Sequence, residues 1–401
     1  MMARSAQHPG GAASPVGRSI VLVGAGHSHL HILKQAGLFA ARGYALTVIA
    51  PDDFWYSGAA SGVLSGQYRP GSERIDIAAL IAGSGATLVR SCLAAIDRAA
   101  RRLVSEDGTA VPFDVVSLNL GSAPVPLPGD NRNVFDVKPV AHLDRLRGAL
   151  ETRHQTNPKA QTRIAIVGGG LTGFEIAASL ERLGQRLDAP FSITVHGGDR
   201  PLADLAKPIA AGVIHALRRR GIAVPDGSRV VSVDDRVLTL ADGRIEPADF
   251  VVNASGLAPA PVIAGLGLPL ASDGSLHVDP WLRSTGDTAV FAAGDCIAFD
   301  GEPLPRVGVY AVRQAPVILH NMLATLEGTP LTRFEPQKHF LTIMNLGDDT
   351  GLALRAGLHW RGRLAWCLKD AIDRRFLANH RPDPMPATVP ADRPELSRSQ
   401  S

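Results

Sequence analysis

The chain has 401 residues, of which 45% are hydrophobic and 20% charged, and its formal net charge is only +3. This composition is ordinary for a soluble globular protein of about two or three domains, and the near balance of charge argues against a nucleic-acid partner. No run of ~18 apolar residues predicts a membrane span. Residues 1–17 lack the apolar core of a secretory signal and predict a disordered tail, so we expect a cytoplasmic protein.

The three cysteines, Cys92, Cys296 and Cys367, lie far apart in the chain and form no CxxC pair. Neither a disulfide framework nor a zinc ribbon is therefore predicted. Alternating histidines in residues 27–31 begin a predicted helix, where successive side chains diverge around the axis. We expect these histidines to pack or hydrogen-bond, and we expect no metal site.

A strand–turn–helix unit occurs twice, in residues 19–37 and 163–184. Each unit begins with an apolar, β-branched run, continues through a glycine turn into a helix-period segment, and is followed by a second apolar strand, at 45–50 or 191–196. The distance between the units is too long for a solenoid repeat. The pattern predicts an α/β fold: two Rossmann-like three-layer (ββα) dinucleotide-binding domains with a short C-terminal region.

Each unit is followed by a segment that alternates like a β-hairpin. Residues 99–117 turn at Asp107-Gly108, and residues 229–253 turn at Asp242-Gly243. We therefore expect each domain to contain its own hairpin crossover and a returning strand.

The first glycine turn is an incomplete GxGxxG motif. Gly24 permits the tight turn, and Gly26 lets the backbone approach a pyrophosphate, but His29 replaces the third glycine. The acid that usually binds ribose is displaced: Ala50 holds its position, and either Asp52 or the next residue could reach a ribose hydroxyl. The alternative is a tight strand–helix turn without a ligand.

The second glycine turn is complete, with Gly168, Gly170 and Gly173 in a strand-turn-helix setting that is typical of a dinucleotide site. No carboxylate follows the next strand directly. Arg200 tolerates the 2′-phosphate of NADPH, whereas Asp199 keeps NADH open. The sequence leaves the choice of nucleotide open.

A third element is the apolar run that ends at Gly294-Asp295, which a helix candidate, Val309 to Leu326, soon follows. In flavoproteins such a strand end directs its carboxylate at the ribityl chain of FAD. An ordinary strand end with a turn residue is the alternative, but the two preceding glycine loops favour FAD.

The order of the two glycine loops, LNLGSAP at 118–124, NASGLAP at 253–259 and FAAGD at 291–295 resembles flavoproteins with two dinucleotide-binding domains. These are the pyridine nucleotide-disulfide oxidoreductase-like enzymes, including type II NADH dehydrogenases. The resemblance covers residues 18–345. GAGHSHLHIL at 24–33 and WCLKDAIDRRF at 366–376 look closest to a subgroup that is sometimes fused to selenide, water dikinase.

The resemblance implies a role for each residue that matches a family motif. The residues that would bind FAD are Gly24, Gly26, His27, Asp52, Tyr56, Ser57, Gly121, Gly294, Asp295, Arg313 and Gln314. Those that would bind NADH or NADPH are Gly168, Gly170, Thr172, Gly173, Glu175, Arg200 and Gly256. Residues 313–315 would begin the helix whose dipole faces the flavin. Glu175 resembles a nicotinamide-pocket glutamate and is the one candidate for a catalytic role; a capping or surface glutamate is the alternative.

The same resemblance implies a division into domains. The expected FAD-binding domain is discontinuous, at 18–145 and 266–330, and encloses an NAD(P)H-binding domain at 146–265. A C-terminal cap with an amphipathic helix would occupy 331–380, followed by a disordered tail at 381–401.

One departure from the family concerns the acceptor. Disulfide reductases of this fold have a cysteine pair after the first helix, but Phe54 to Gly66 contains no cysteine. Cys296 and Cys367 are not placed to support sulfide oxidation. We therefore expect FAD to take a hydride from NAD(P)H and to pass electrons to a small-molecule acceptor, with a quinone favoured over a dye-like molecule or a carrier protein. An oxidase or monooxygenase, and a non-catalytic redox sensor, are the alternative functions.

Residues 358–377 predict an amphipathic helix with an apolar face and several Trp and Arg residues. The apolar face consists of Leu364, Cys367, Leu368, Ala371, Ile372 and Phe376. Such residues are typical of a helix that contacts a membrane interface, here on its cytoplasmic face. A helix packed in the core or in a homodimer is the alternative.

Overall fold

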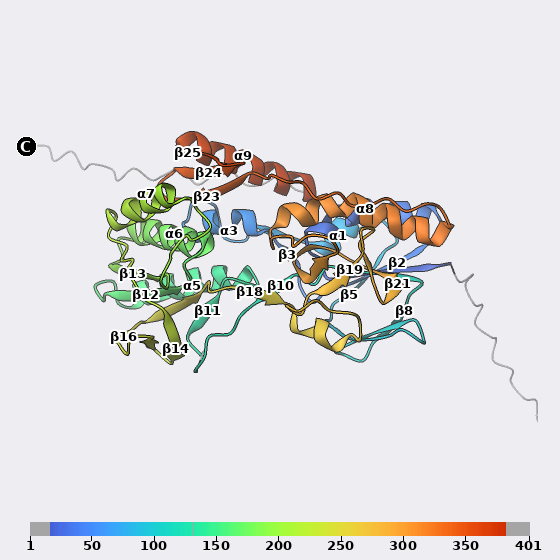
Figure 1. Ribbon diagram of the computed structural model, residues 1–401, viewed down its shortest axis with the longest axis horizontal. Coiled ribbons are helices and arrows are strands. Elements are labelled where there is room, and N and C mark those ends of the chain that lie inside the picture. The colour runs from blue at the N-terminus through green and yellow to red at the C-terminus, as the bar shows by residue number, and fades with distance from the viewer. Residues whose placement is uncertain (1–16, 131, 382–401) are drawn as a thin grey trace, which may run out of the picture.

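The computed structural model describes residues 17–130 and 132–381, which form two lobes side by side with the C-terminal segment lying across both (Figure 1). The tails predicted at 1–17 and 381–401 lie almost entirely outside the described residues.

The first lobe is built on an eight-stranded sheet in the order β22-β19-β20-β21-β9-β1-β2-β5. Five neighbouring strands, from β21 to β5, run parallel, as expected for a dinucleotide-binding sheet. The strand bounds are β1 Ser19–Val23, β2 Ala45–Ile49, β5 Thr87–Val89, β9 Val115–Leu118, β19 Leu276–Val278, β20 Arg283–Ser284, β21 Asp287–Ala292 and β22 Ile297–Phe299.

Helices and a small sheet flank this large sheet. Helices α1 (His27–Leu33) and α8 (Gly308–Glu327) pack together, and α8 also contacts β9 and β21. In the view of Figure 1 they lie above the large sheet, and the antiparallel sheet of β6, β7 and β8 lies below it. The bounds of the remaining elements of this lobe are α2 Gly37–Ala41, β3 Phe54–Trp55, β4 Arg74–Ile75, α4 Ile77–Ile81, β6 Leu93–Asp97, β7 Arg102–Ser105, β8 Ala110–Pro112 and the 3-10 helix η1 Pro261–Gly265. Helix α3 (Ser57–Leu64), between β3 and β4, contributes side chains to the cores of both lobes and packs on helices of the second.

The second lobe repeats the plan on a smaller scale. Its four parallel strands run in the order β11-β17-β12-β13, and a second antiparallel sheet, β14-β15-β16, follows the predicted hairpin with its turn at Asp242-Gly243. The bounds are β11 Val134–Asp136, α5 Ala141–Thr156, β12 Thr162–Val167, α6 Leu171–Leu187, β13 Phe191–His196, α7 Lys207–Arg218, β14 Val230–Asp234, β15 Val237–Leu240, β16 Ile245–Pro247 and β17 Phe250–Asn253.

The chain crosses between the lobes in a two-stranded antiparallel ladder of β10 (Ser122–Pro124) and β18 (Leu257–Pro259). Strand β11 pairs with β17, and α5 contributes Leu146 and Leu150 to the second core, so residues before 146 already belong to the second lobe. We propose the β10–β18 ladder as the domain boundary in place of the boundaries expected at 145 and 266. A three-residue strand such as β11 has too little periodicity to be recognised in the sequence.

The C-terminal segment forms an antiparallel sheet of β23 (Thr342–Asn345), β24 (Gly351–Arg355) and β25 (Leu358–Gly362), followed by α9 (Arg363–His380). The helix predicted from residue 358 is therefore wrong for its first five residues. Ala356 and Gly357 both have positive φ, 50° and 79°, and form a two-residue hairpin turn that pairs 358–362 with β24.

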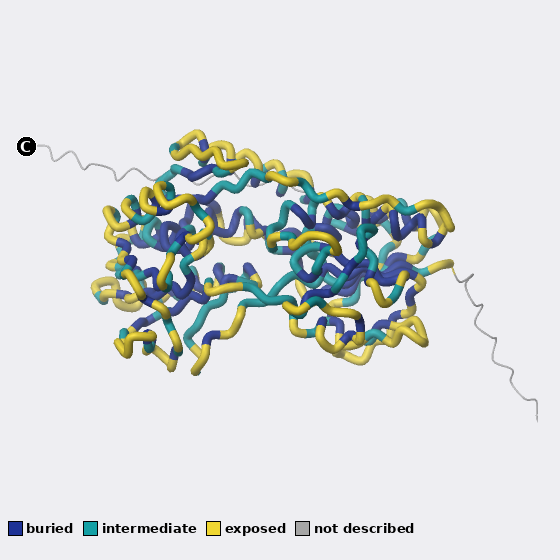
Figure 2. Tube along the Cα trace, in the orientation of Figure 1, coloured by how far each residue is buried: buried dark blue, intermediate teal, exposed yellow. Residues whose placement is uncertain are grey.

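Each lobe has its own buried core (Figure 2). Met344 and Leu352 of the C-terminal sheet join the core of the second lobe, whereas Leu377 near the end of α9 joins the core of the first. The C-terminal segment therefore packs on both lobes and lies over the place where they meet.

Candidate functional site

The first glycine turn packs tightly against Asn119 at the end of β9. A Cβ atom on Gly24, which has φ +81°, would lie 2.4 Å from Asn119 O, and one on Gly26 would lie 2.3 Å from Asn119 Oδ1. Asn119 also donates to Ala293 O at 2.7 Å, just before the Gly294 turn. Asn119 was not among the predicted site residues, although its place at a strand end in LNLGSAP indicated a position near the glycine turn.

His29, in the position of the missing third glycine, replaces close packing with hydrogen bonds. In the complete motif a Cβ on Gly173 would lie 2.2 Å from Gly168 O, so only glycine fits. In the first motif, His29 Nδ1 donates to the corresponding carbonyl, Gly24 O, at 2.5 Å, and Nε2 accepts from Ser117 Oγ at 2.8 Å. Burial lowers the pKa of His29 to about 4, so the ring is neutral.

The two aspartates after β2 have different surroundings. Asp53 is buried and forms ion pairs with Arg74 and Arg90, each at 2.6 Å. Burial opposes its charge, but the two guanidinium groups hold its pKa below the usual value. Asp52 is exposed and accepts hydrogen bonds from Asp53 N at 2.7 Å and from Trp55 Nε1 at 3.3 Å. The carboxylate that remains accessible to a ribose hydroxyl is therefore that of Asp52.

Asp295 lies in a short 3-10 turn, η2 (Gly294–Cys296), after β21. Its Oδ2 accepts from Lys138 Nζ at 2.6 Å and from Ser122 Oγ at 2.8 Å. Burial disfavours the charged carboxylate, but Lys138, together with Ser122 and His27, holds the pKa of Asp295 below its usual value. Nearby Gly121 has φ +69° and open space around its Cα. Asp295 was predicted from the sequence, whereas Lys138 was not.

Helix α8 begins at Gly308, within one residue of the helix predicted at 309–326 and five residues before the start that the family resemblance implied at 313–315. The implied start was wrong because residues 308–312 already have helical geometry after an extended cap at Val307. Gln314 is buried, and its Oε1 accepts from Gly294 N at 2.8 Å, which fixes the Asp295 turn. Arg313, the residue before Gln314, is exposed and is not brought to this turn.

Tyr56 is held by the inner face of α9, although the two are far apart in sequence. Its hydroxyl donates to Asp373 Oδ1 at 3.0 Å, and its ring stacks on Phe376 with 4.1 Å between centroids. Burial, followed by the charge of Asp373, raises the pKa of Tyr56. The ring of His27 lies beside these rings, with its centroid 5.9 Å from that of Tyr56 and 4.9 Å from that of Phe54. Desolvation lowers the pKa of His27 to about 4.

Lys369 is a buried cation next to Tyr56. Its Nζ donates to Gly58 O and lies 2.7 Å from Asp373 Oδ2. Burial opposes the charge of Lys369, but Asp373 and then Glu175 hold its pKa above the usual value. Ser57, the first residue of α3, is exposed beside this cluster.

Glu175 joins three elements rather than lying free on the surface of α6. Its Oε1 accepts from Ser61 Oγ of α3 at 2.7 Å and from Asn345 N of β23 at 3.0 Å. The carboxylate is therefore positioned between both lobes and the C-terminal sheet. This geometry does not fit the alternative of a surface or capping glutamate.

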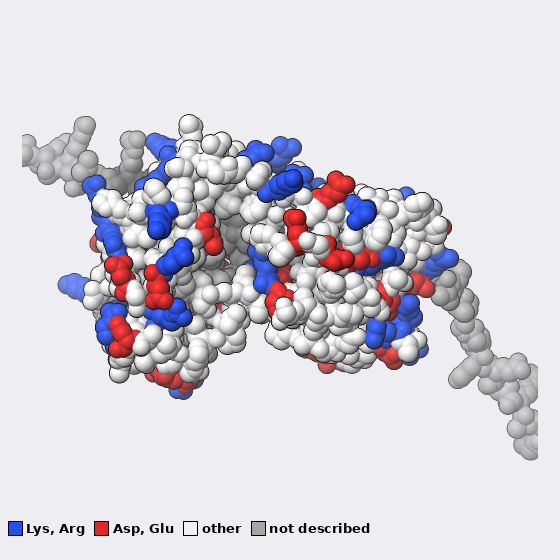
Figure 3. All heavy atoms as spheres, viewed as in Figure 1, with Lys and Arg blue, Asp and Glu red and all other residues white. Residues whose placement is uncertain are grey.

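A cavity of about 380 Å³ lies where the lobes face each other, and Figure 3 shows the surface hollowed between them. A Cβ on Gly170 would meet open space. Three predicted residues of the second lobe line this cavity: Gly170 and Thr172 from the second glycine turn, and Gly256 from the NASGLAP segment. Val137 and Arg306 line it as well.

Residues after β13 bear on the choice of nucleotide. Gly197, which follows β13 as Ala50 follows β2, occupies the usual position of the ribose acid, and His196 before it is buried. Asp199 is bound by Arg229 at 2.6 Å, and Arg200 is exposed. Within residues 196–200, the only carboxylate, that of Asp199, is therefore paired, and Arg200 lies on the surface next to it.

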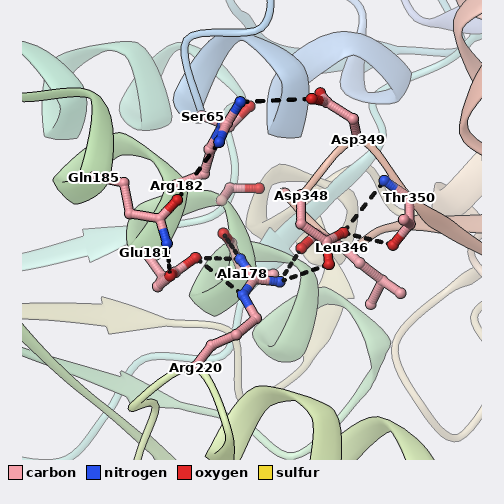
Figure 4. Close-up of polar contacts among 12 residues, drawn as sticks. Ser65, Ala178, Glu181, Arg182, Gln185, Arg220, Leu346, Asp348, Asp349 and Thr350 are labelled. Carbon is pink, nitrogen blue, oxygen red and sulfur yellow. Dashed lines mark hydrogen bonds and ion pairs between the residues drawn. The ribbon is translucent and has the colours of Figure 1, made fainter. Parts of the chain in front are cut away.

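The C-terminal hairpin is attached to the second lobe by Arg220, the last of three consecutive arginines at the end of α7 (Figure 4). Arg220 forms an ion pair with Glu181, donates to Leu346 O and lies 3.7 Å from Asp348 Oδ2. These contacts hold β23 and β24 next to α6, where Glu175 is.

Comparisons with known proteins agree with this geometry. The sequence profile of the family described as "Pyridine nucleotide-disulphide oxidoreductase" matches residues 18–315. The chain belongs to this family. The match extends from the first strand through both glycine loops and the Asp295 turn to the first part of α8.

Relatives within the family differ in their named acceptors. The protein named "Probable ferredoxin reductase CtmF" from Castellaniella defragrans is 29% identical over 75% of this chain and 73% of its own length. The demethylphylloquinone reductase NdbB from Synechocystis sp. is also 29% identical, over 71% of this chain and 73% of its own. The subgroup fused to selenide, water dikinase stays a prediction.

Solved structures share the fold at low sequence identity. NDH2 from Plasmodium falciparum, in complex with NADH, has a TM-score of 0.76 and 15% identity, covering 91% of this chain and 96% of that one. The sulfide:quinone oxidoreductase from Aquifex aeolicus has a TM-score of 0.74 and 15% identity, with 91% of each chain covered. These similarities confirm the predicted fold of two Rossmann-like domains.

The expected cofactors, FAD and NAD(P)H, are confirmed by membership of the family. The residues present fit both groups. Oδ2 of Asp295 is occupied by two donors, which leaves its other oxygen for a hydroxyl of a ligand, and Gly121 and Gly170 both have open space beside them. The described cysteines do not add a dithiol, because Cys296 is buried with its thiol pKa raised to about 11 by burial, and Cys367 is exposed on α9.

Proposed function

We propose that this chain is an FAD-dependent NAD(P)H dehydrogenase that delivers electrons to a quinone without a redox dithiol. Bound FAD would supply the hydride acceptor and the redox chemistry. The protein would supply orientation and electrostatics: the first lobe would hold FAD through the Gly24 turn and Asp295, and the second would hold the nucleotide through the Gly168 turn. Glu175, between the two, would position the nicotinamide.

The choice of a quinone as acceptor rests on the apolar face of α9, which points outward. The inner face of α9 has a buried ion pair beside the buried apolar residues Ala365 and Leu377, and it touches the site through Lys369, Asp373 and Phe376. The outer face is apolar: Leu364 is 82% exposed, and Leu368 and Ile372 are exposed as well. A water-soluble helix normally has the opposite arrangement, with its apolar face in the core.

The apolar surface continues onto β25 and is flanked by positive charge. Leu358 is 73% exposed, and Trp360 is exposed two residues later. Arg361, Arg363 and Arg375 are exposed around the same surface. Exposed apolar side chains beside Trp and Arg suit the interface of an anionic bilayer, where a lipid-soluble quinone is dissolved. No helix among the described residues is long and apolar enough to cross a bilayer, so the contact that we propose is peripheral, on the cytoplasmic face.

The test compares a quinone dissolved in anionic vesicles with a short-chain, water-soluble quinone. The variant Leu364→Glu with Ile372→Glu should release the protein from vesicles and lower turnover with the vesicle-borne quinone by about tenfold, because two charges oppose transfer into the interface. Turnover with the water-soluble quinone should not change. Ile245→Glu, at a residue 68% exposed on β16 of the second lobe, is the matched control.

Three results would contradict this proposal. The first is that the wild-type protein does not bind vesicles, and the second is that the double variant and the Ile245→Glu control behave alike. The third is that the wild-type protein forms a homodimer that the double variant disrupts. A small iron–sulfur protein is the second candidate acceptor, because relatives such as CtmF are named ferredoxin reductases. Reduction of such a protein with no reduction of either quinone would favour that acceptor.

A further inference from the structure

Lys138 connects the two lobes at the Asp295 turn. Its backbone follows β11, and the neighbouring Val137 N donates to Asn253 O of β17, so Lys138 is anchored to the sheet of the second lobe. Its side chain crosses to the first lobe, where Nζ lies 2.6 Å from Asp295 Oδ2. The two residues are 157 positions apart in the chain.

The hydrogen bonds at this pair are unevenly distributed. Lys138 Nζ and Ser122 Oγ both donate to the same oxygen of Asp295, Oδ2. Among the described residues, Oδ1 of Asp295 has no hydrogen-bond donor. Lys138 Nζ also donates to Ser122 Oγ at 2.8 Å. The lysine therefore fixes one carboxylate oxygen and leaves the other for a ligand.

We propose that Lys138 is a positioning residue for FAD: it keeps the buried Asp295 ionised and oriented, with Oδ1 presented to a hydroxyl of the bound cofactor. This inference rests on the proposed function, because it takes Asp295 as an FAD ligand. It also gives the second lobe a direct part in binding FAD. Val137 lines the cavity between the lobes, so the same short loop borders the proposed nucleotide site.

Several groups face the Asp295 carboxylate, but Lys138 is the nearest cation to it. His27 of α1 faces it from one side and is neutral near pH 7, since its pKa is lowered to about 4 by burial. Arg306, before α8, donates to the backbone oxygen of Asp295 at 3.2 Å, while its guanidinium is bound by Asp273 at 2.7 Å. Cys296 in the same turn is a neutral thiol.

Removal of the ammonium group should therefore have a pH-dependent effect. Burial raises the pKa of Asp295, and Lys138 is the largest influence that lowers it. In Lys138→Met, only the hydrogen bond from Ser122 and the proximity of His27 would still oppose the effect of burial, so the carboxyl would take up a proton at a higher pH than in the wild type. The protonated group no longer offers a charged acceptor, and FAD should then bind less tightly as the pH falls.

The experiment measures the dissociation constant of FAD for the apoprotein, from the quenching of flavin fluorescence, between about pH 8 and about pH 5. Affinity of the wild type should be nearly constant over this range. Lys138→Met should weaken binding by about tenfold from the upper to the lower pH, and Lys138→Arg should restore the flat profile. Lys159→Met, at an exposed lysine after α5, is the matched control and should follow the wild type.

Asp295→Asn separates failure of this inference from failure of the proposed function. It should weaken FAD binding at every pH, with a flat profile. If Asp295→Asn weakens binding but Lys138→Met stays flat and wild-type-like, the positioning role is refuted and the FAD site stands. If Asp295→Asn leaves FAD affinity unchanged, the assignment of Asp295 to FAD in the proposed function is itself wrong.

Discussion

Tyr56 donates its hydroxyl hydrogen to Asp373 over 3.0 Å, although 317 positions separate the two residues in the chain. Tyr56 precedes α3, in the segment where disulfide reductases of this family would have their cysteines. Asp373 comes from α9, whose opposite face is apolar and exposed. One helix therefore contacts both the proposed flavin site and the surface from which the acceptor would arrive.

Replacement of Asp373 should disturb both stability and the site. In Asp373→Asn, the buried Lys369 loses its ion pair, and uncompensated buried charges cost roughly 3 kcal/mol. The side chains of Lys369 and Asp373 are only 9% and 4% exposed, so solvent cannot replace the lost contact. Denaturant unfolding measures the loss. Arg375→Met, at an exposed residue of the same helix, should change stability by less than about 0.5 kcal/mol. Equal effects of the two substitutions would contradict the role of the buried pair.

Acid should destabilise the first lobe through His29. Its folded pKa of about 4 is below the usual value of 6.5, so the unfolded chain binds more protons between these two values. The free energy of unfolding should therefore fall as the pH drops from 6.5 towards 4, by on the order of 3 kcal/mol from this residue. Above pH 6.5, His29 should not affect the free energy of unfolding. In His29→Gln, the slope over this window should become shallower; an unchanged slope would show that other groups cause the acid sensitivity.

Arg220 should stabilise the attachment of the C-terminal sheet. Arg220→Met leaves Leu346 O without its donor and Glu181 without its ion-pair partner, although Gln185 still donates to Glu181, and both lie at a largely buried contact. We expect a loss of about 3 kcal/mol in the free energy of unfolding, together with faster hydrogen exchange in β23 and β24. Arg219→Met is the control, because the neighbouring Arg219 is exposed. Unchanged exchange in β23 and β24 would mean that the core contacts of Met344 and Leu352 suffice.

Glu175 should affect reduction by the nucleotide more than folding. Glu175→Gln retains an oxygen that can accept from Ser61 and Asn345, so stability should change by less than about 1 kcal/mol. Loss of the charge beside the proposed nicotinamide position should slow bleaching of the flavin by about tenfold or more in rapid mixing. If bleaching is as fast as in the wild type, Glu175 has only the structural role of joining α3, α6 and β23.

The sequence was informative where function depends on local backbone geometry. The glycine turns at Gly24 and Gly168, and the hairpins at Asp107 and Asp242, were predicted because these turns require particular residues at fixed spacing. Helix α8 was also predicted to within one residue at each end, although its part facing the site was not.

Contacts between distant segments could not be predicted in the same way. Lys138 had no motif around it, and its partner Asp295 lies on the other lobe. The inner face of α9 was equally hidden: the apolar residues of 363–376 predicted a face that could be buried or could contact a membrane. The structure puts this face outside, except for Phe376, which stacks on Tyr56, because Lys369 and Asp373 satisfy each other against Gly58 and Tyr56.

The most direct test of the account is an anaerobic titration of the purified protein with NADH and, separately, with NADPH, followed by a quinone analogue. Flavin absorbance near ~450 nm reports the state of the cofactor. The account predicts that at least one nucleotide bleaches the flavin and that the quinone restores the colour. A protein that contains no flavin, or whose flavin neither nucleotide bleaches, would contradict the assignment as an NAD(P)H dehydrogenase; a bleached flavin that oxygen but not quinone restores would identify an oxidase instead.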